Sequence, residues 1–247
     1  MPVRPADQGR WKGGALLANT PRACRESLLL VVGCLCAIIT ARAGIIVPAL
    51  DSGTYNASGF HLAANKSYTT GIAGGVENRS YFVFSIPVLP AQLVSAVLEL
   101  ENPVNGYRSP DPMETLQIFE VSTPLAMLQA TNFGAIAIFA DLGTGTPYAF
   151  RTVSAADNNT LINIPLNAAA LAAITGAAGG SLAFGGALTS LAGVTDEFVF
   201  GFTGTGSPIR RLELTFVPEP AVAGPLSAAL FAFGLAVWKR HRARREQ

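Results

Sequence analysis

Apolar and polar residues alternate along most of the middle of the chain, with a period of two residues. Such alternation places the apolar side chains on one face of a half-buried β-strand. The pattern predicts strands in the following segments: 81–85, 94–101, 116–121, 161–164, 198–202 and 211–216.

Pieces rich in Gly, Pro, Asn and Asp separate these strands, at 102–106, 109–112, 143–145, 157–159 and 204–206. Short strands divided by such turns are typical of antiparallel architectures. The sequence therefore predicts a mainly β domain, an antiparallel β-sandwich that is jelly-roll-like and has short helices. We expect Asn167 to cap a helix over 168–175, and 131–142 to hold another helical turn or two.

A different pattern, an unbroken apolar run, occurs near the start of the chain. Residues 28–39 carry no charge, and Arg22 and Arg25 precede them. A helix of twelve residues is about 18 Å long, which is short of a bilayer core of about 30 Å. The small residues Ala41 and Ala43 then complete the pattern of a signal peptide with cleavage between Ala43 and Gly44. A lipoprotein signal at Cys34 is less favoured, because apolar residues continue beyond it.

The second apolar run lies near the end of the chain. Residues 221–238 are eighteen residues without a charge, and as a helix they would be about 27 Å long, enough to span a bilayer. The cations that follow are expected to stay in the cytoplasm as a basic stop: Lys239, Arg240, Arg242, Arg244 and Arg245. The sequence thus predicts a C-terminal transmembrane helix in addition to the N-terminal signal helix.

Pro218, Glu219 and Pro220 stand directly before this run. The two prolines prevent a helix from continuing into the domain and favour an extended, accessible backbone around Glu219. Together with the apolar run and basic tail, this tripeptide resembles the PEP-CTERM sorting signal of Gram-negative bacteria and some cyanobacteria, over about residues 217–245. The motif matches residue for residue, although 221–223 reads Ala-Val-Ala where many members have Ser-Thr-Trp. The alternative is a plain anchor with an incidental Pro-Glu-Pro.

The residue patterns and the resemblance together imply three regions and two partner enzymes, of which the sorting signal and the exosortase come from the resemblance. The regions are a signal peptide (1–43), an extracytoplasmic β-sandwich domain (44–216) and a sorting signal (217–247), which comprises the motif, the membrane helix 221–238 and the tail 239–247. The partners are signal peptidase and an exosortase, a membrane enzyme that acts near the motif. We expect a single-pass membrane precursor in the cell envelope, and release to the surface or extracellular matrix stays open.

The positions of the charged residues and cysteines exclude several classes of function for the middle domain. The chain carries a net charge of +1, but residues 44–217 hold six basic and twelve acidic residues, a net charge of −6. Such a domain lacks the basic cluster that nucleic acid would require. The three cysteines all precede Gly44, which excludes disulfides, cysteine-bound metal and a thiol nucleophile from the domain.

A search for catalytic constellations in the domain gives no convincing candidate. His61 is the one histidine between residues 44 and 217, and we expect it in a surface or loop position rather than as a base. No zinc-protease motif and no phosphate-binding glycine loop is present. Glu99 and Glu101 lie on the same face of one strand; we interpret them as its solvated face, with a carboxylate pair for glycoside cleavage as the alternative. The domain is therefore predicted to be non-enzymatic, with no cofactor.

The loop before the third predicted strand holds the candidate ligand contacts. Tyr107 beside Arg108 could offer a stacking surface for a sugar. Asp111 and Glu114 supply carboxylate oxygens of the kind that calcium prefers, but a plain turn is the favoured interpretation and we assign no metal. The expected function is an exported envelope or matrix protein linked to exopolysaccharide or biofilm. A carbohydrate-binding module is the first alternative, and a carboxylate-based glycosidase or lyase is the second.

Overall fold

The computed structural model describes residues 44–193, 196–204, 208–217, 242 and 244. The predicted signal peptide with Ala41 and Ala43, the motif Pro218-Glu219-Pro220 and the apolar run 221–238 lie outside these residues. So do Lys239, Arg240 and Arg245, whereas Arg242 and Arg244 are described and exposed. Within the described ranges, no helix combines the length and the hydropathy needed to cross a membrane.

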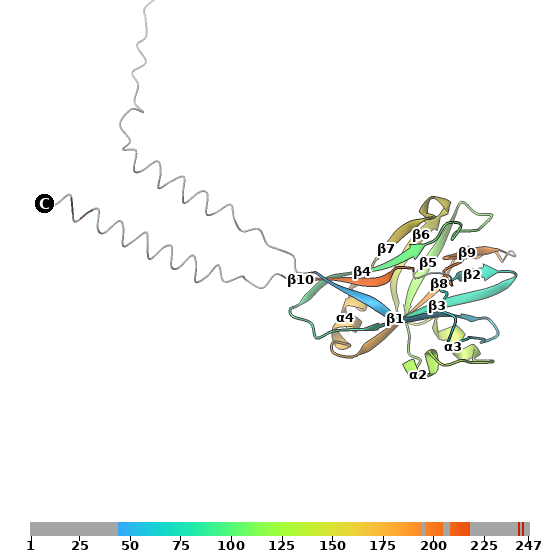
Figure 1. The fold of residues 1–247 in the computed structure, drawn as a ribbon, viewed down its shortest axis with the longest axis horizontal. Coiled ribbons are helices and arrows are strands. Elements are labelled where there is room, and N and C mark those ends of the chain that lie inside the picture. The colour runs from blue at the N-terminus through green and yellow to red at the C-terminus, as the bar shows by residue number, and fades with distance from the viewer. Residues whose placement is uncertain (1–43, 194–195, 205–207, 218–241, 243, 245–247) are drawn as a thin grey trace, which may run out of the picture. The chain divides into compact units, whose positions relative to one another are not determined.

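The domain is mainly antiparallel β with a few short helices, which confirms the predicted class (Figure 1). Its strands are β1 (Gly44–Asn56), β2 (Thr70–Ala73), β3 (Val76–Ser85), β4 (Leu93–Asn102), β5 (Met113–Glu120), β6 (Pro147–Ser154), β7 (Thr160–Pro165), β8 (Ser181–Leu188), β9 (Glu197–Val199) and β10 (Arg210–Phe216). Its helices are α2 (Leu125–Leu128), α3 (Ile136–Asp141), the 3₁₀ turn η1 (Ala155–Asp157) and α4 (Ala168–Gly176).

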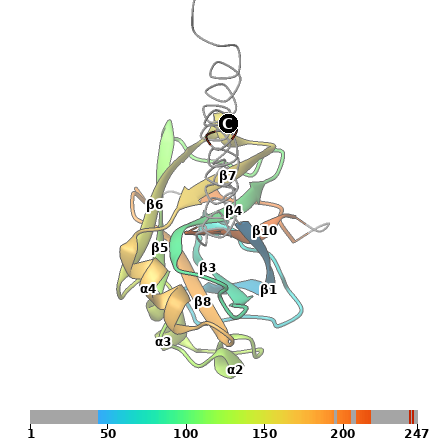
Figure 2. The same ribbon diagram turned by 90° about the vertical axis from the view of Figure 1, so that its left-hand side faces the viewer.

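Eight strands form one continuous order, β6-β5-β8-β3-β1-β10-β4-β7, while β2 pairs with β3 and β9. The first half of β1 pairs with β10, starting at Gly44 opposite Thr215, and the second half pairs with β3. A register shift between Ala49 and Asp51 marks the change of partner, and a bulge of this kind bends a strand. Because η1 joins the end strands β6 and β7, the sheet is nearly closed (Figure 2).

β1 connects two parts of this sheet, β6-β5-β8-β3 and β10-β4-β7, and the core lies between them. Leu98 on β4 and Leu212 on β10 are fully buried, and they belong to one apolar cluster with Phe82 and Phe84 of β3. Burial of each such side chain stabilises a fold by about 1.5–3 kcal/mol. The apolar positions of the period-two pattern therefore supply the buried faces of both parts of the sheet.

The strand expected over 198–202 is wrong in its second half. β9 ends at Val199, and Phe200 and Phe202 have positive φ angles of 57° and 63°. This left-handed backbone is incompatible with a strand, so the three phenylalanines do not share one face. The Phe200 N–H instead donates to Oδ1 of Asn102, at 3.2 Å.

The helix predicted after Asn167 is confirmed. Oδ1 of Asn167 accepts a hydrogen bond from the Ala170 N–H at 3.1 Å, and α4 buries Ala170 and Ile174. This is the ordinary N-cap geometry. Figure 1 shows α4 near the end of the domain where β10 stops, whereas α2 and α3 lie together farther along.

Candidate functional site

Three of the four predicted ligand contacts, Tyr107, Arg108 and Asp111, lie in the loop between β4 and β5, and Glu114 lies at the start of β5. Tyr107 is the buried residue of the three. The Tyr107 hydroxyl donates to the Asp111 carbonyl at 2.6 Å, and its N–H donates to Oδ1 of Asn158 at 2.8 Å. The residue is only 8% exposed. The stacking surface for a sugar predicted at Tyr107 is therefore covered, and the ring holds the loop closed instead.

Arg108 lies on the outside of the same loop. Its side chain is 67% exposed and forms an ion pair with Asp196 at 3.1 Å. Its backbone pairs with Phe198, with N–H to carbonyl distances of 2.9 and 2.7 Å. Arg108 thus ties the β4–β5 loop to β9, which follows it by many residues in the chain.

Asp111 and Glu114 meet a third carboxylate that the sequence did not suggest. Carboxylate oxygens of Asp111, Glu114 and Glu197 all lie within 4.8 Å of one another. Both glutamates are fully buried, and Asp111 is exposed. No local spacing links Glu197 to the other two, because only the pairing of the loop with β9 brings them together.

Each buried carboxylate in this cluster already receives donors from the protein. Glu114 accepts from the hydroxyls of Ser109, at 2.5 Å, and Ser190. Glu197 accepts from the N–H groups of Ala192 and Gly193 at 2.6 and 3.0 Å. Calcium takes about six to eight oxygen ligands, and three carboxylates meet only part of that demand. We interpret the cluster as a polar connection between loops and assign no metal to it.

The cluster also affects the phenol beside it. Burial raises the pKa of Tyr107, and the charges of Glu114, Asp111 and Glu197 raise it further, against a lowering hydrogen bond with Ser109. A phenol with a raised pKa stays neutral near pH 7, so Tyr107 acts as a hydrogen-bond donor.

Glu99 and Glu101, the alternative pair for glycoside cleavage, are both engaged in the structure. Glu99 is only 7% exposed and pairs with Nε of Arg211 on β10, which corrects the expectation of a solvated face at this position. Oε2 of Glu101 accepts from the Ile209 N–H at 2.8 Å. Both carboxylates therefore tie β4 to β10 or to the residue before it.

His61 is buried, not at a surface position as the sequence suggested. It is 1% exposed and its ring stacks on Tyr55, with 4.6 Å between ring centroids. Its Nδ1 lies 2.9 Å from the carbonyl oxygen of Thr54, and its Nε2 lies 3.2 Å from the hydroxyl of Tyr81. The second ring nitrogen is thus covered by the core, which removes His61 from contact with any external substrate.

An exposed aromatic contact lies elsewhere, between the loop after β1 and the segment between α2 and α3. The rings of Phe60 and Phe133 lie 5.4 Å apart and are inclined at 58°. They are 37% and 76% exposed, and Leu62 and Ile136 nearby in the chain are exposed as well. No period or motif in the sequence singles out these residues.

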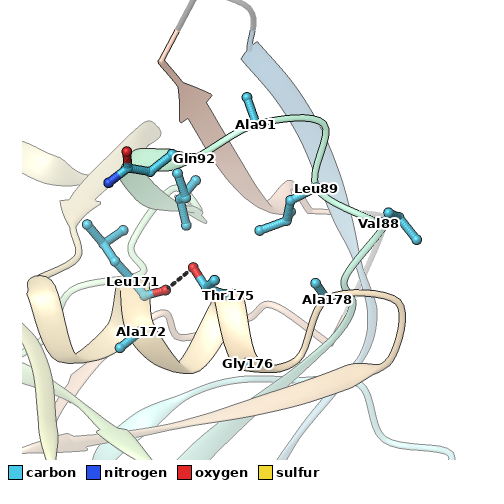
Figure 3. Close-up of a pocket in the computed structure, with 10 residues that line it drawn as sticks. Val88, Leu89, Ala91, Gln92, Leu171, Ala172, Thr175, Gly176 and Ala178 are labelled. Atoms are coloured by element: carbon cyan, nitrogen blue, oxygen red, sulfur yellow. Dashed lines mark hydrogen bonds between the residues drawn. The ribbon is translucent and has the colours of Figure 1, made fainter. Parts of the chain in front are cut away.

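An apolar groove lies between α4 and the loop that joins β3 to β4 (Figure 3). It has a volume of about 780 Å³. Figure 3 shows Leu171 and Thr175 of α4 on one side and Leu89 and Gln92 of the loop on the other. None of its lining residues is charged: Val88, Leu89, Ala91, Gln92, Leu93, Leu171, Ala172, Thr175, Gly176 and Ala178.

The polypeptide leaves the domain at the rim of this groove. The Val217 N–H donates to the Gln92 carbonyl at 2.9 Å, one residue beyond the pairing of Phe216 with Leu93. Gly44, the first residue of β1, pairs with Thr215 in the adjacent ladder. Val217 is therefore beside the groove, and Gly44 lies across β10 from the groove-lining residue Leu93 of β4.

No protein-family model matches the chain, and a search of curated proteins also finds no match.

Proposed function

We propose that the chain is an exported protein of the bacterial cell envelope, delivered by its N-terminal signal peptide and sorted through the PEP-CTERM signal at its C-terminus. Its middle domain is non-enzymatic and works as a surface or matrix component linked to exopolysaccharide or biofilm. Signal peptidase and an exosortase-type enzyme are its processing partners, and the helix 221–238 anchors the precursor in the membrane.

One observation carries the proposal: the folded domain fills the interval between the two targeting segments. The described strands run from Gly44, the first described residue, to Phe216 at the end of β10, and Val217 stands between that strand and the motif. Cleavage after Ala43 would leave the pairing of Gly44 with Thr215 intact. The lack of cysteine in 44–217 also fits a domain that folds outside the cytoplasm without disulfides.

For the domain itself we propose the jelly-roll-like β-sandwich. The strand order and the sharing of β1 between two antiparallel parts support it, because jelly rolls stack two such sheets over one core. A fold of this kind does not define an activity.

The test of the sorting proposal is replacement of Pro218, Glu219 and Pro220 by alanine in the native host. We expect an uncleaved precursor that stays in the membrane fraction, against a shortened wild-type product. The matched control replaces Pro110 and Pro112, two exposed prolines of the β4–β5 loop with the same spacing, to separate sorting from the general effect of losing prolines. Equal processing of the motif variant and the wild type would contradict the proposal.

Saccharide binding is the second candidate function, and the pair Phe60–Phe133 favours it. Exposed aromatic rings of this kind offer large apolar faces on which the apolar face of a sugar ring can stack. Affinity electrophoresis through gels of the host exopolysaccharide tests it. Retardation should be lost in Phe133→Ala and kept in Phe150→Ala, an equally exposed phenylalanine on β6 (76% and 77%). Equal migration of the wild type in gels with and without polysaccharide would exclude this function.

A further inference from the structure

The end of the domain where the chain leaves is free of charge. Four segments meet there, 44–48, 86–96, 168–180 and 214–217, and none contains Asp, Glu, Lys or Arg. They are joined by the contacts of Gly44 with Thr215 and of Val217 with Gln92, and by the hydrogen bond of the Ile86 N–H with the Gly180 carbonyl at 2.8 Å. We call this surface the charge-free end.

The charged residues of the domain lie outside these four segments, and those nearest the first segment are Glu213 and Arg211 of β10, which pair with Ile46 and Pro48. The eighteen charged residues of 44–217 give the domain its net charge of −6. The nearest charge along β10 is Glu213, which lies about 13 Å back from Val217 at a rise of about 3.3 Å per residue. An apolar or low-dielectric surface can thus approach the charge-free end without desolvating an ionised group of its segments.

The charge-free end also exposes apolar side chains. Val88 is 80% exposed at the tip of the β3–β4 loop, Val94 is 46% exposed, and Val217 is 40% exposed. Next to them the apolar groove opens between Leu89 and α4 (Figure 3). Neighbouring exposed apolar residues of this kind mark a contact surface.

The length of chain after Val217 identifies what covers this surface. Only Pro218, Glu219 and Pro220 separate Val217 from the apolar run that begins at Ala221. Four Cα steps span at most about 14 Å. If the run enters the bilayer, Val217 and the loop that it bonds to are held within that distance of the point of entry.

We propose that the charge-free end is the membrane-facing surface of the domain, with Val88 and Leu89 in contact with the interfacial region of the lipid bilayer. The proposal rests on the function proposed above, because it requires the helix 221–238 to be inserted. The short chain between Val217 and Ala221 brings the charge-free end to the membrane. The rest of the domain is acidic, so anionic lipid repels it and its charged groups stay hydrated on the side away from the bilayer.

This orientation has a consequence for sorting. With the domain seated on the bilayer, the chain between Val217 and Ala221 has at most about 14 Å of reach in which an enzyme can engage the motif. A sorting enzyme embedded in the membrane would reach the motif there from the side.

The test places an environment-sensitive fluorophore on the full chain in vesicles. Cys24, Cys34 and Cys36 are replaced by serine, and Val88→Cys is labelled with a nitrobenzoxadiazole dye. The matched control is Val104→Cys, an exposed valine (61%) beyond the other end of β4, about 30 Å away along that strand. The vesicles are made of phosphatidylcholine, with and without phosphatidylglycerol.

We expect a blue-shifted emission and several-fold slower reduction by external dithionite for the dye at position 88, relative to the dye at position 104. Alkaline carbonate extraction of the same vesicles reports insertion separately: a chain removed by carbonate contradicts the anchored precursor itself. An inserted chain with equal dithionite rates at both positions overturns the membrane-facing surface. Protection at position 88 that disappears as the protein is diluted in lipid would assign the surface to contacts between copies, and would also overturn it.

Discussion

Nε2 of His61 lies 3.2 Å from the Tyr81 hydroxyl, while Nδ1 of the same ring lies 2.9 Å from the Thr54 carbonyl oxygen. A carbonyl oxygen only accepts, so Nδ1 carries the proton and Nε2 of the neutral ring accepts from Tyr81. Protonation of His61 would place a second N–H against the phenol oxygen in a closed core. Burial lowers the pKa of His61 below its ordinary value of 6.5, while the bond to Thr54 and the charge of Asp51 oppose this shift and Lys66 adds to it.

The first prediction is that the domain loses stability in mild acid. Because the pKa of His61 is lower in the folded chain, the unfolded chain binds the proton of this residue more tightly. The stabilisation that neutral His61 gives the folded state is therefore complete above pH 6.5 and is lost as the pH falls through the folded pKa. Urea unfolding at several pH values between about 7.5 and 5 should show a falling midpoint. His61→Gln, which cannot titrate, should flatten this dependence even if its overall stability is lower. An unchanged slope in His61→Gln would assign the acid sensitivity to other groups.

The second prediction concerns Gly185 on β8. A Cβ at this position would lie 2.6 Å from the Leu142 carbonyl oxygen and 2.8 Å from its Cα, and backbone atoms cannot move aside easily. Gly185→Ala should lower the free energy of unfolding by about 1–3 kcal/mol. Gly176→Ala is the matched control, since nothing lies within 4 Å of its added Cβ; at the end of α4 it should be neutral or stabilise by up to about 1 kcal/mol. Equal thermal midpoints for the two variants would show that β8 can shift away from Leu142.

The third prediction concerns Asp141 at the end of α3, whose carboxylate accepts four hydrogen bonds. They come from the N–H and hydroxyl groups of Ser122 and Thr123, at 2.7 to 3.0 Å. Partial burial raises the pKa of Asp141, but these bonds outweigh it and the pKa is lowered from its ordinary value of 3.8. Asp141→Ala should reduce stability by about 1–2 kcal/mol near neutral pH. Exposed Glu213→Ala should change it by less than about 0.5 kcal/mol.

The hydrogen bonds of Asp141 also determine the direction of its pH dependence. A lowered folded pKa means that the stabilisation is present above pH 3.8 and is lost as the pH falls through the folded value. The difference in urea midpoint between wild type and Asp141→Ala should therefore shrink in strong acid. A difference that stays constant down to about pH 2 would contradict this account.

The fourth prediction concerns divalent cations at Asp111, Glu114 and Glu197. Because the two buried carboxylates already accept hydrogen bonds from Ser109, Ser190, Ala192 and Gly193, the fold does not depend on an ion to balance them. The thermal midpoint should be the same in EDTA and in millimolar calcium. A ligand that binds the folded state raises the midpoint with its concentration, so a calcium-dependent rise would overturn the interpretation as a connection between loops.

Sequence patterns located the strands whose faces alternate cleanly. β7 and β10 lie where the period of two placed them, because each exposes one face and buries the other. The predictions over 94–101 and 116–121 fall on β4 and β5, although Glu99 and Phe119 are buried on the face expected to be solvated. β8 escaped notice, since its Gly and Ala residues have low β-propensity. The structure explains this composition, because a side chain at Gly185 would collide with the backbone of Leu142.

β1 escaped notice for a different reason. It contains Pro48 and changes partner between Ala49 and Asp51, so its buried positions do not keep a constant period. Contacts between residues far apart in the sequence could not be predicted either, because no spacing connects Glu197 with Glu114, or Phe60 with Phe133. His61 was misplaced because a single polar residue gives no periodic signal, and its burial depends on Tyr55 and Tyr81 around it.

The position of β10 between β1 and β4 bears on how the domain would respond to mechanical load. The strand continues directly into Val217, so a pull from the membrane side acts along the strand axis. Its hydrogen bonds to β1 and β4 run across that axis and would have to shear together rather than open one at a time. A pull on Val217 would thus load the two ladders of β10 together, and the last strand would not peel off one residue at a time.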